Sequence, residues 1–275
     1  MIFGCVNMNK KFKLGVIGCG FMASAIINGA ITSKVLNVDD IIVSDANADA
    51  LIKMSNVGIK TTTSNVELVS NSEFVLFAIK PQNLNAVLED IKDCKCDKYI
   101  SIMAGVKKQK IKNYFKTAKV ARCMPNTPCS IGYGAIGLDL SDFSDLIDVE
   151  FIKNLLSSLA NVVCLEEDKL NAVTGISGSS PAYFYLFLKG IIESGVKQGL
   201  TYEDAKILAT STMIGAGKMV LNNNDKTLDQ LIDAVCSKGG TTIEAVSVFN
   251  QFELSDITDK AIDACVKRAA ELEKL

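Results

Sequence analysis

The segment that most restricts the fold is a glycine turn near the start of the chain, Gly18 to Ala23. It follows the apolar run at residues 13–17 and precedes residues 22–33, which have helical spacing, so the expected order is strand, turn, helix. The turn fits GxGxxA, in which the glycines permit a tight turn and close approach of a pyrophosphate, and the alanine permits close helix packing. A turn without a ligand is the alternative, but the complete strand and helix context favours a bound dinucleotide.

Short apolar runs continue through the N-terminal half and are separated by helix-like segments. Strands are expected at residues 41–44, 74–79, 99–103 and 119–124, and helices at residues 83–91 and 107–115. This alternation is typical of an α/β fold, a doubly wound, mostly parallel Rossmann sheet with helices on both faces.

From about Glu166 the strand-like runs stop. The expected helices lie at residues 170–196, 202–221, 228–235, 242–249 and 257–272. A chain of 275 residues is long enough for two domains. We therefore predict a dinucleotide-binding domain at residues 1–165 and an all-helical domain at residues 166–275.

Composition excludes several classes of partner. The net charge is −2, from 29 basic and 31 acidic residues, and no basic cluster predicts nucleic-acid binding. No apolar stretch is long enough to predict a membrane span. The N-terminal segment places an apolar start before its lysines, the reverse of a signal peptide, so a soluble, cytoplasmic protein is expected. Met8 is a possible start of translation, because the residues after it lead directly into the first strand.

The nine cysteines suit a reducing compartment. Cys94 and Cys96 form a CxC pair, but the chain has no histidine and no second close pair of cysteines. No metal site is expected.

Asp45 ends the second expected strand. An acidic side chain there can accept hydrogen bonds from ribose hydroxyls and would repel a 2′-phosphate, which favours NADH over NADPH. Alternatively, Asp45 only caps the helix that begins near Asn47. The residue types leave both interpretations open.

The segment from Ser237 to Glu244 carries the most chemical information. Thr241 and Glu244 match a capping box, which predicts Thr242 as the first helical residue. Capping does not account for two preceding glycines and a second hydroxyl, an arrangement that leaves backbone N–H groups open to a carboxylate or another anion.

Two further motifs, Lys80-Pro81 and Ala104-Gly105, are expected at the carboxyl edge of the sheet, where open α/β folds bind ligands. The segment Gly175–Tyr183 predicts a kink or break in an apolar helix. Together, six motifs resemble the pyrroline-5-carboxylate reductase family over nearly the whole chain. They are GCGFMA, AIKP, MAGV, RCMPNTP, SGSSPAY and SKGGTTIEA.

The resemblance implies an enzyme that reduces the C=N bond of 1-pyrroline-5-carboxylate to give L-proline, with NADPH or NADH as the cofactor. It also implies self-association through the helical domain into a dimer, and often into a larger assembly of dimers. The cofactor residues that it implies are Gly18, Cys19, Gly20, Phe21, Met22, Ala23, Asp45, Asn65, Ala78, Ile79, Lys80, Pro81 and Ala104.

The substrate residues implied by the resemblance are Ser237, Gly239, Gly240, Thr241 and Thr242, with Thr242 at the family's catalytic threonine position. Glu166 or Glu167 is implied near the substrate. Lys238 stands where the family commonly has proline. As a hypothesis, the N–H groups of Gly240, Thr241 and Thr242 bind the substrate carboxylate, and the Thr242 hydroxyl bonds the ring nitrogen.

Two other functions are compatible with a dinucleotide-binding domain followed by a helical domain. A 3-hydroxyacid dehydrogenase has the same two-domain plan, but oxidising an alcohol requires a Lys or His proton acceptor, and the helical-domain motif offers hydroxyls and glycines. A redox sensor would bind the dinucleotide without chemistry, and it would have no use for an anion-binding segment in the second domain.

Overall fold

The computed structural model describes residues 11–274. Met8, the possible start of translation, lies outside the described residues. The chain forms two compact units: the first extends to Ser179 and also includes the chain from Cys265 onward, and the second is Ser180–Ala264. The first unit thus extends beyond the domain boundary predicted at residue 165, because the segment after it packs on strand β7: a Cβ on Gly137 would lie 2.8 Å from the Val173 side chain.

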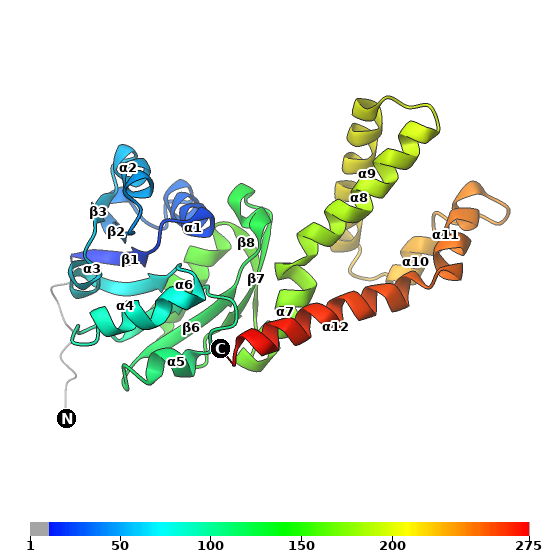
Figure 1. Cartoon of the computed structure of the whole chain (residues 1–275). Helices are drawn as coiled ribbons and strands as arrows, with labels where there is room; N and C mark the ends of the chain where they lie inside the picture. The colour runs from blue at the N-terminus through cyan, green and yellow to red at the C-terminus, as the bar shows by residue number, and fades with distance from the viewer. Residues whose placement is uncertain (1–10, 275) are drawn as a thin grey trace. The chain divides into compact units, whose positions relative to one another are not determined.

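An eight-stranded sheet forms the centre of the first unit (Figure 1). Its strand order is β3-β2-β1-β4-β5-β6-β7-β8, and every neighbouring pair is parallel except β6 and β7. The strands are β1 (Phe12–Ile17), β2 (Ile41–Ser44), β3 (Lys60–Thr62), β4 (Ser72–Phe77), β5 (Lys98–Ser101), β6 (Lys119–Met124), β7 (Gly134–Asp139) and β8 (Ala160–Cys164). The predicted mostly parallel, doubly wound sheet is confirmed.

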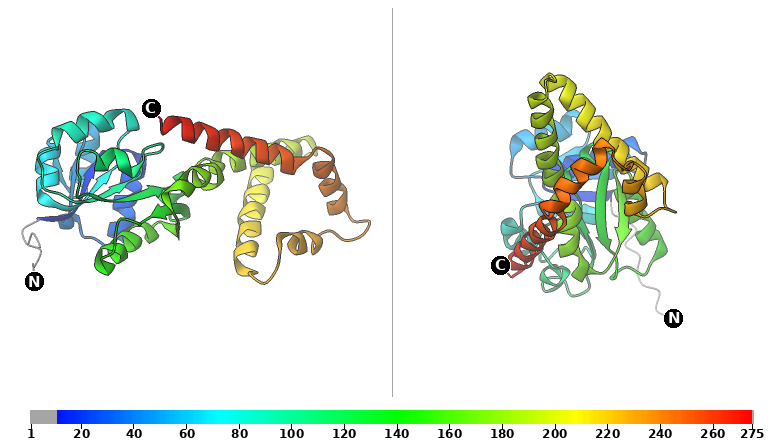
Figure 2. Two further views of the ribbon diagram at one scale, coloured as in Figure 1. Left: turned by 90° about the horizontal axis from the view of Figure 1, so that it is seen from below. Right: turned by 90° about the vertical axis from the view of Figure 1, so that its right-hand side faces the viewer.

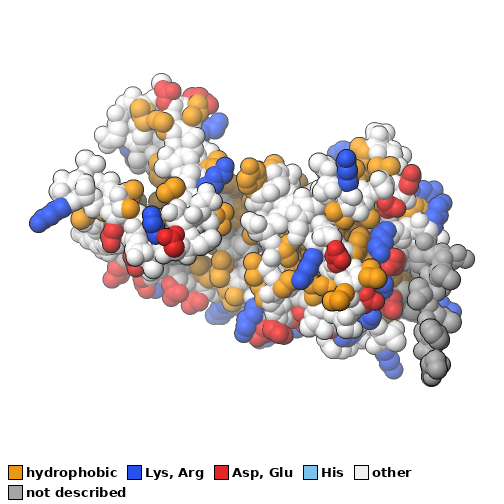
Figure 3. Space-filling view, turned by 180° about the vertical axis from the view of Figure 1, so that it is seen from behind, with side chains coloured by type: hydrophobic (Ala, Val, Ile, Leu, Met, Phe, Trp, Pro, Cys, Tyr) orange, Lys and Arg blue, Asp and Glu red, His pale blue; other side chains and the backbone are white. Residues whose placement is uncertain are grey.

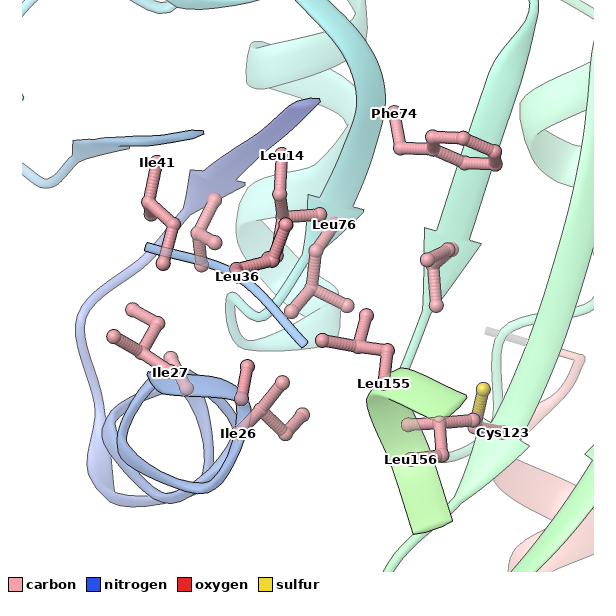
Figure 4. Close-up of a cluster of buried hydrophobic side chains, with 14 of the residues drawn as sticks. Leu14, Ile26, Ile27, Leu36, Ile41, Phe74, Leu76, Cys123, Leu155 and Leu156 are labelled. Atoms are coloured by element: carbon pink, nitrogen blue, oxygen red, sulfur yellow. The ribbon is translucent and has the colours of Figure 1, made fainter. Parts of the chain in front are cut away.

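Helices cover both faces of this sheet. They are α1 (Phe21–Thr32), α2 (Ala48–Asn56), α3 (Asn65–Asn71), α4 (Leu84–Asp90), α5 (Lys108–Lys112) and α6 (Leu146–Ser157). One core includes side chains of β1, α1 and α6, among them Leu14, Ile26 and Leu155 (Figure 4). The other includes side chains of α3, α4 and α5. The chain order reverses between β1 and β4, which places the ligand crevice of an open α/β sheet at the carboxyl ends of these strands.

Short helical segments follow the sheet within the first unit. They are a 3₁₀ turn (Glu167–Lys169), α7 (Leu170–Val173) and a π-helical turn (Thr174–Gly178). The π turn is the predicted interruption of the apolar helix, and its ladder shifts so that Ser179 N donates to Thr174 O at 2.8 Å.

The second unit contains only helices, as predicted. They are α8 (Ser180–Lys197), α9 (Tyr202–Asn222), α10 (Leu228–Asp233), α11 (Thr241–Gln251) and the first part of α12 (Leu254–Leu272). Helices α8 and α9 pack as a pair (Figure 2). No helix in the described part of the chain is both long and apolar enough to cross a membrane.

Candidate active site

Gly18 makes the sharp turn at the end of β1. Its φ of +101° is in the left-handed region, and a Cβ there would lie 2.6 Å from the carbonyl oxygen of Ala78. Its N–H donates to Ser44 O at 2.7 Å, which ties the turn to the end of β2. Only glycine satisfies both the dihedral angle and the close approach of the β4 backbone.

Gly20 begins helix α1 as its N-cap residue. Its φ of −67° is an ordinary value, and no side chain caps the helix start. A Cβ on Gly20 would meet no atom within 4 Å, so the space in front of α1 is open. The N–H groups of Phe21, Met22 and Ala23 precede the intrahelical ladder and point toward that space. An open cradle with exposed N–H groups fits the pyrophosphate of a dinucleotide.

The Cys19 side chain is buried between these two glycines. Burial, and then the charge of Asp45, raise the pKa of its thiol to about 12. The thiol is therefore neutral at physiological pH. It adds no negative charge beside the phosphate-binding N–H groups.

Asp45 accepts two backbone hydrogen bonds. Its Oδ2 accepts from Cys19 N at 2.6 Å and its Oδ1 from Asn47 N at 2.8 Å. Helix α2 is instead capped by Asn47, whose side chain accepts from Asp49 N at 3.0 Å. The alternative that Asp45 merely caps this helix is therefore wrong. Each oxygen keeps further acceptor capacity, so the carboxylate can still receive ribose hydroxyls.

Asn65 lies beside the end of β2. Its Oδ1 accepts from the Ser44 hydroxyl at 2.8 Å, and its Nδ2 donates to Asp90 Oδ2 at 3.1 Å. These two bonds fix the orientation of the amide. Its predicted contact with the cofactor stays a prediction.

The ends of β1, β4 and β5 meet at the carboxyl edge. Ala78 N donates to Ile17 O at 2.9 Å, and Ile102 N donates to Phe77 O at 3.2 Å. Lys80 and Ala104 are exposed just beyond these strand ends. The fold thus brings the thirteen predicted cofactor residues to one side of the first unit. They come from the turns after β1, β2, β4 and β5 and from the starts of α1 and α3.

The RCMPNTP motif contacts β7 and the π-helical turn. Asn126 Nδ2 donates to Ser177 O at 3.1 Å, and Asn126 Oδ1 accepts from Ala135 N at 3.0 Å. A Cβ on Gly178 would lie 2.7 Å from Met124 Cε. Met124 and Asn126 therefore fix the π-helical turn against the sheet, a role that no local sequence pattern signalled.

Glu167, implied near the substrate, has protein partners in the first unit. Its Oε1 accepts from Lys108 N at 2.8 Å and from Arg122 Nη1 at 3.2 Å. One of its two carboxylate oxygens is thus engaged by a buried arginine and by the start of α5.

In the second unit, the segment Ser237–Thr242 forms a turn in front of α11. Gly239 has a φ of +71°, and Gly240 N donates to Ser237 O at 2.9 Å. Gly240 is the N-cap residue, no side chain caps the helix, and α11 begins at Thr241. The predicted capping box of Thr241 and Glu244 is therefore wrong, and the helix starts one residue earlier than expected.

The earlier helix start determines which backbone N–H groups are free to bind a ligand. The Gly240 N–H is engaged within the turn, whereas those of Thr241, Thr242 and Ile243 are the first three of α11. Thr241 and Thr242 are exposed, and neither hydroxyl caps the helix. Both hydroxyls and the helix-start N–H groups can meet an anionic ligand.

The second unit exposes most of its apolar side chains (Figure 3). Among its apolar residues, only Ile192 and Ala205 are buried. An apolar groove runs between α8 and α9 and is lined by residues such as Phe187, Leu208 and Met213. A unit with so little core of its own requires a partner surface to bury these side chains.

Comparison with known proteins accounts for both units. Residues 167–272 match the family model described as pyrroline-5-carboxylate reductase dimerisation, and residues 13–105 match the model described as NADP oxidoreductase coenzyme F420-dependent. A pyrroline-5-carboxylate reductase from Vibrio alginolyticus is 33% identical over 267 residues, which cover 96% of this chain and 98% of the relative. The chain belongs to the pyrroline-5-carboxylate reductase family. It is therefore a nicotinamide-dependent oxidoreductase that self-associates through its dimerisation region.

Other relatives and solved structures agree. The pyrroline-5-carboxylate reductase of Pasteurella multocida (strain Pm70) is 35% identical, covering 94% of this chain and 97% of the relative. The structure of the reductase from Coxiella burnetii has a TM-score of 0.88 and 31% identity, covering 96% of this chain and 100% of that one. The Plasmodium falciparum enzyme, solved with NADP bound, has a TM-score of 0.84 and 27% identity, covering 96% and 99% of the two chains.

Proposed function

We propose that this chain reduces 1-pyrroline-5-carboxylate to L-proline at the start of α11. The observation that carries the proposal is the turn before this helix. Gly239 adopts a left-handed conformation, Gly240 caps the helix without a side-chain acceptor, and the Thr242 hydroxyl remains exposed. The substrate has one carboxylate and one ring imine, which match one helix start and one hydroxyl.

The N–H groups of Thr241, Thr242 and Ile243 bind the substrate carboxylate. They carry the partial positive charge of the helix N-terminus, and no side chain competes for them. Compared with the set expected from the sequence, Ile243 replaces Gly240, whose N–H donates to Ser237 O. Lys238, exposed in the same turn, adds a positive charge on this side.

Thr242 orients the ring. An imine that is protonated before binding donates its N–H to the Thr242 hydroxyl oxygen and is already an electrophile at carbon. When bound, the reduced nicotinamide supplies the hydride to this carbon. The electron pair of the C=N bond then returns to nitrogen, and the product is a neutral secondary amine. No general acid is needed, which suits a chain without histidine.

The preferred cofactor is NADH. The anchored Asp45 carboxylate is available to the ribose hydroxyls, and no lysine or arginine in the described residues forms an ion pair with it. A 2′-phosphate at this position would meet a fixed negative charge. The fixed carboxylate therefore supports NADH, although the Plasmodium falciparum relative was solved with NADP.

The self-associated form is a dimer that covers the apolar faces of α8 and α9. Burial of only Ile192 and Ala205 among the apolar residues of the second unit supports this arrangement. Sedimentation across a wide concentration range tests it. A folded monomer that persists at micromolar concentration would contradict it.

The test of the function is the oxidation of NADH and NADPH, in parallel, with synthetic 1-pyrroline-5-carboxylate as the acceptor. We expect the imine and the reduced cofactor to be consumed together, L-proline to form, and kcat/KM to be higher with NADH than with NADPH. A cofactor that binds without turnover would indicate the sensor instead. Turnover of 3-hydroxyacids in place of the imine would indicate the dehydrogenase.

A further inference from the structure

The turn after β5 is in contact with the end of the chain. Gly105 has a φ of +69°, and a Cβ at this position would lie 2.9 Å from the Cβ of Leu272, the last residue of α12. Both residues belong to the first unit. The backbone of the Ala104–Gly105 turn therefore packs directly against the C-terminal end of α12 (Figure 1).

Glu273 adds two charged contacts to this packing. Its Oε1 lies 3.0 Å from Arg122 Nη2, and its Oε2 lies 3.4 Å from Lys107 Nζ. The Glu273 side chain is 9% exposed and that of Arg122 4%. The bond to Arg122 joins residues 151 positions apart in the chain. One carboxylate thus ties the segment after Gly105 to the central strand β6.

Arg122 also pairs with a second carboxylate, that of Glu167 in the 3₁₀ turn after β8. Its Nη1 lies 3.2 Å from Glu167 Oε1, and the same Glu167 oxygen accepts from Lys108 N at 2.8 Å. The segment after Ala104 is therefore attached at three residues: by packing at Gly105, by an ion pair at Lys107 Nζ, and by a backbone hydrogen bond at Lys108 N. We call Arg122, Glu167, Leu272 and Glu273 the C-terminal clamp.

Acidic and basic side chains alternate in the C-terminal clamp. Two acids face the Arg122 guanidinium, and Lys107 supplies the second positive charge. Burial alone would raise the pKa of Glu273, but hydrogen bonds from Asn171 and Arg122 and the charges of Arg122 and Lys107 hold it below its usual value. Loss of Arg122 would leave both carboxylates without their shared buried partner, whereas loss of Glu273 leaves Arg122 paired with Glu167 alone.

We propose that the C-terminal clamp is a positioning device for the reduced cofactor, which holds the Ala104–Gly105 turn in place at the edge of the proposed cofactor site. The inference rests on the proposed cofactor site, because Ala104 is one of its lining residues. Leu272 and Glu273 do not contact the cofactor. They act through Gly105 and Lys107, so they are positioning residues rather than catalytic ones.

The test compares Glu273→Gln and Leu272→Ala with Glu271→Gln in the full-length protein. Glu271 is a matched control on the same helix, because its carboxylate pairs with Arg268 at 2.9 Å and both side chains are exposed. Three quantities are measured for each variant: the Kd for NADH by fluorescence titration without the imine, the KM and kcat for both substrates, and the Tm without cofactor.

Glu273→Gln and Leu272→Ala are expected to raise the Kd for NADH about fivefold, with the KM for the imine within about twofold of the original value. Glu271→Gln is expected to change neither constant. A lower Tm with an unchanged Kd for NADH would show a purely structural role and overturn the proposal. If Glu273→Gln does not fold, Leu272→Ala, which removes no charge, decides by the same criterion.

Failure of the clamp is distinguishable from failure of the proposed function. If the original protein binds NADH and both variants bind it equally well, only the clamp is refuted. If the original protein binds neither NADH nor NADPH, the proposed cofactor site itself is refuted, and the clamp with it.

Discussion

The backbone N–H of Cys19 donates a hydrogen bond of 2.6 Å to the Asp45 carboxylate. This bond joins the glycine turn after β1 to the end of β2, across 26 residues of sequence. It fixes a negative charge next to the turn that is proposed to bind the pyrophosphate. The carboxylate holds the turn in shape through this bond, and we propose that it also selects the ribose substituent.

Replacing Asp45 is expected to shift the cofactor preference. In Asp45→Asn and Asp45→Ser, the ratio of kcat/KM for NADPH to that for NADH should rise about tenfold, because a charge repulsion of roughly 1 to 2 kcal/mol with the 2′-phosphate is removed. Asp49→Asn is the control, since Asp49 is an exposed acid in the first turn of α2. An unchanged ratio in both Asp45 variants would contradict this role.

Replacing Gly18 should mainly affect the stability of the fold, whereas replacing Gly20 should mainly affect the binding of the cofactor. Gly18→Ala is expected to lower the free energy of unfolding by about 2 kcal/mol, because alanine at a φ of +101° is strained and its Cβ would press on Ala78 O. Gly20→Ala should change that free energy by less than about 0.5 kcal/mol, yet raise the Kd for NADH about tenfold by filling the phosphate cradle. Chemical denaturation and fluorescence titration measure the two effects. Equal effects of the two variants on stability would refute this assignment.

Glu273 should contribute stability that disappears in acid. Its pKa in the folded protein lies below the unfolded value of about 4.3, so the stabilisation is present above that pH and is lost as the pH falls through the folded pKa. When the pH is lowered from about 6 to about 3, the Tm of the original protein should therefore fall by more than the Tm of Glu273→Gln. Thermal unfolding of both proteins at several pH values checks this. Parallel curves would show that the ion pairs of Glu273 contribute no stability.

The sequence predicted the sheet best where its strands are buried on both faces. Strands β1, β2, β4, β5 and β6 each contain a short run of buried, mostly apolar residues, as is typical of parallel strands between two layers of helices. Strands β3 and β8 are short or largely exposed, and β7 contains Gly134 and Gly137, so none of the three has this pattern. A Cβ on Gly137 would lie 2.8 Å from Val173, so a tertiary contact explains that glycine.

The glycine turn could be predicted from the sequence because the residues that form it are adjacent in the chain. The contacts that could not be predicted join distant parts of the chain, such as Cys19 with Asp45 and Arg122 with Glu273. The start of α11 was predicted one residue late, because Thr241 and Glu244 fit a capping pattern that the turn at Gly240 replaces. Local patterns locate a helix start, but they do not show which donors are already engaged.

The most direct test of the account is kcat/KM for 1-pyrroline-5-carboxylate in Thr242→Ala, with Thr242→Ser as the matched control. A hydrogen bond to a charged group is worth about 1.5 to 3 kcal/mol, so the alanine variant should lose about tenfold to a hundredfold in kcat/KM. The serine variant keeps the hydroxyl and should remain within about fivefold of the original protein. Full activity of Thr242→Ala would contradict the assignment of this hydroxyl to the ring nitrogen.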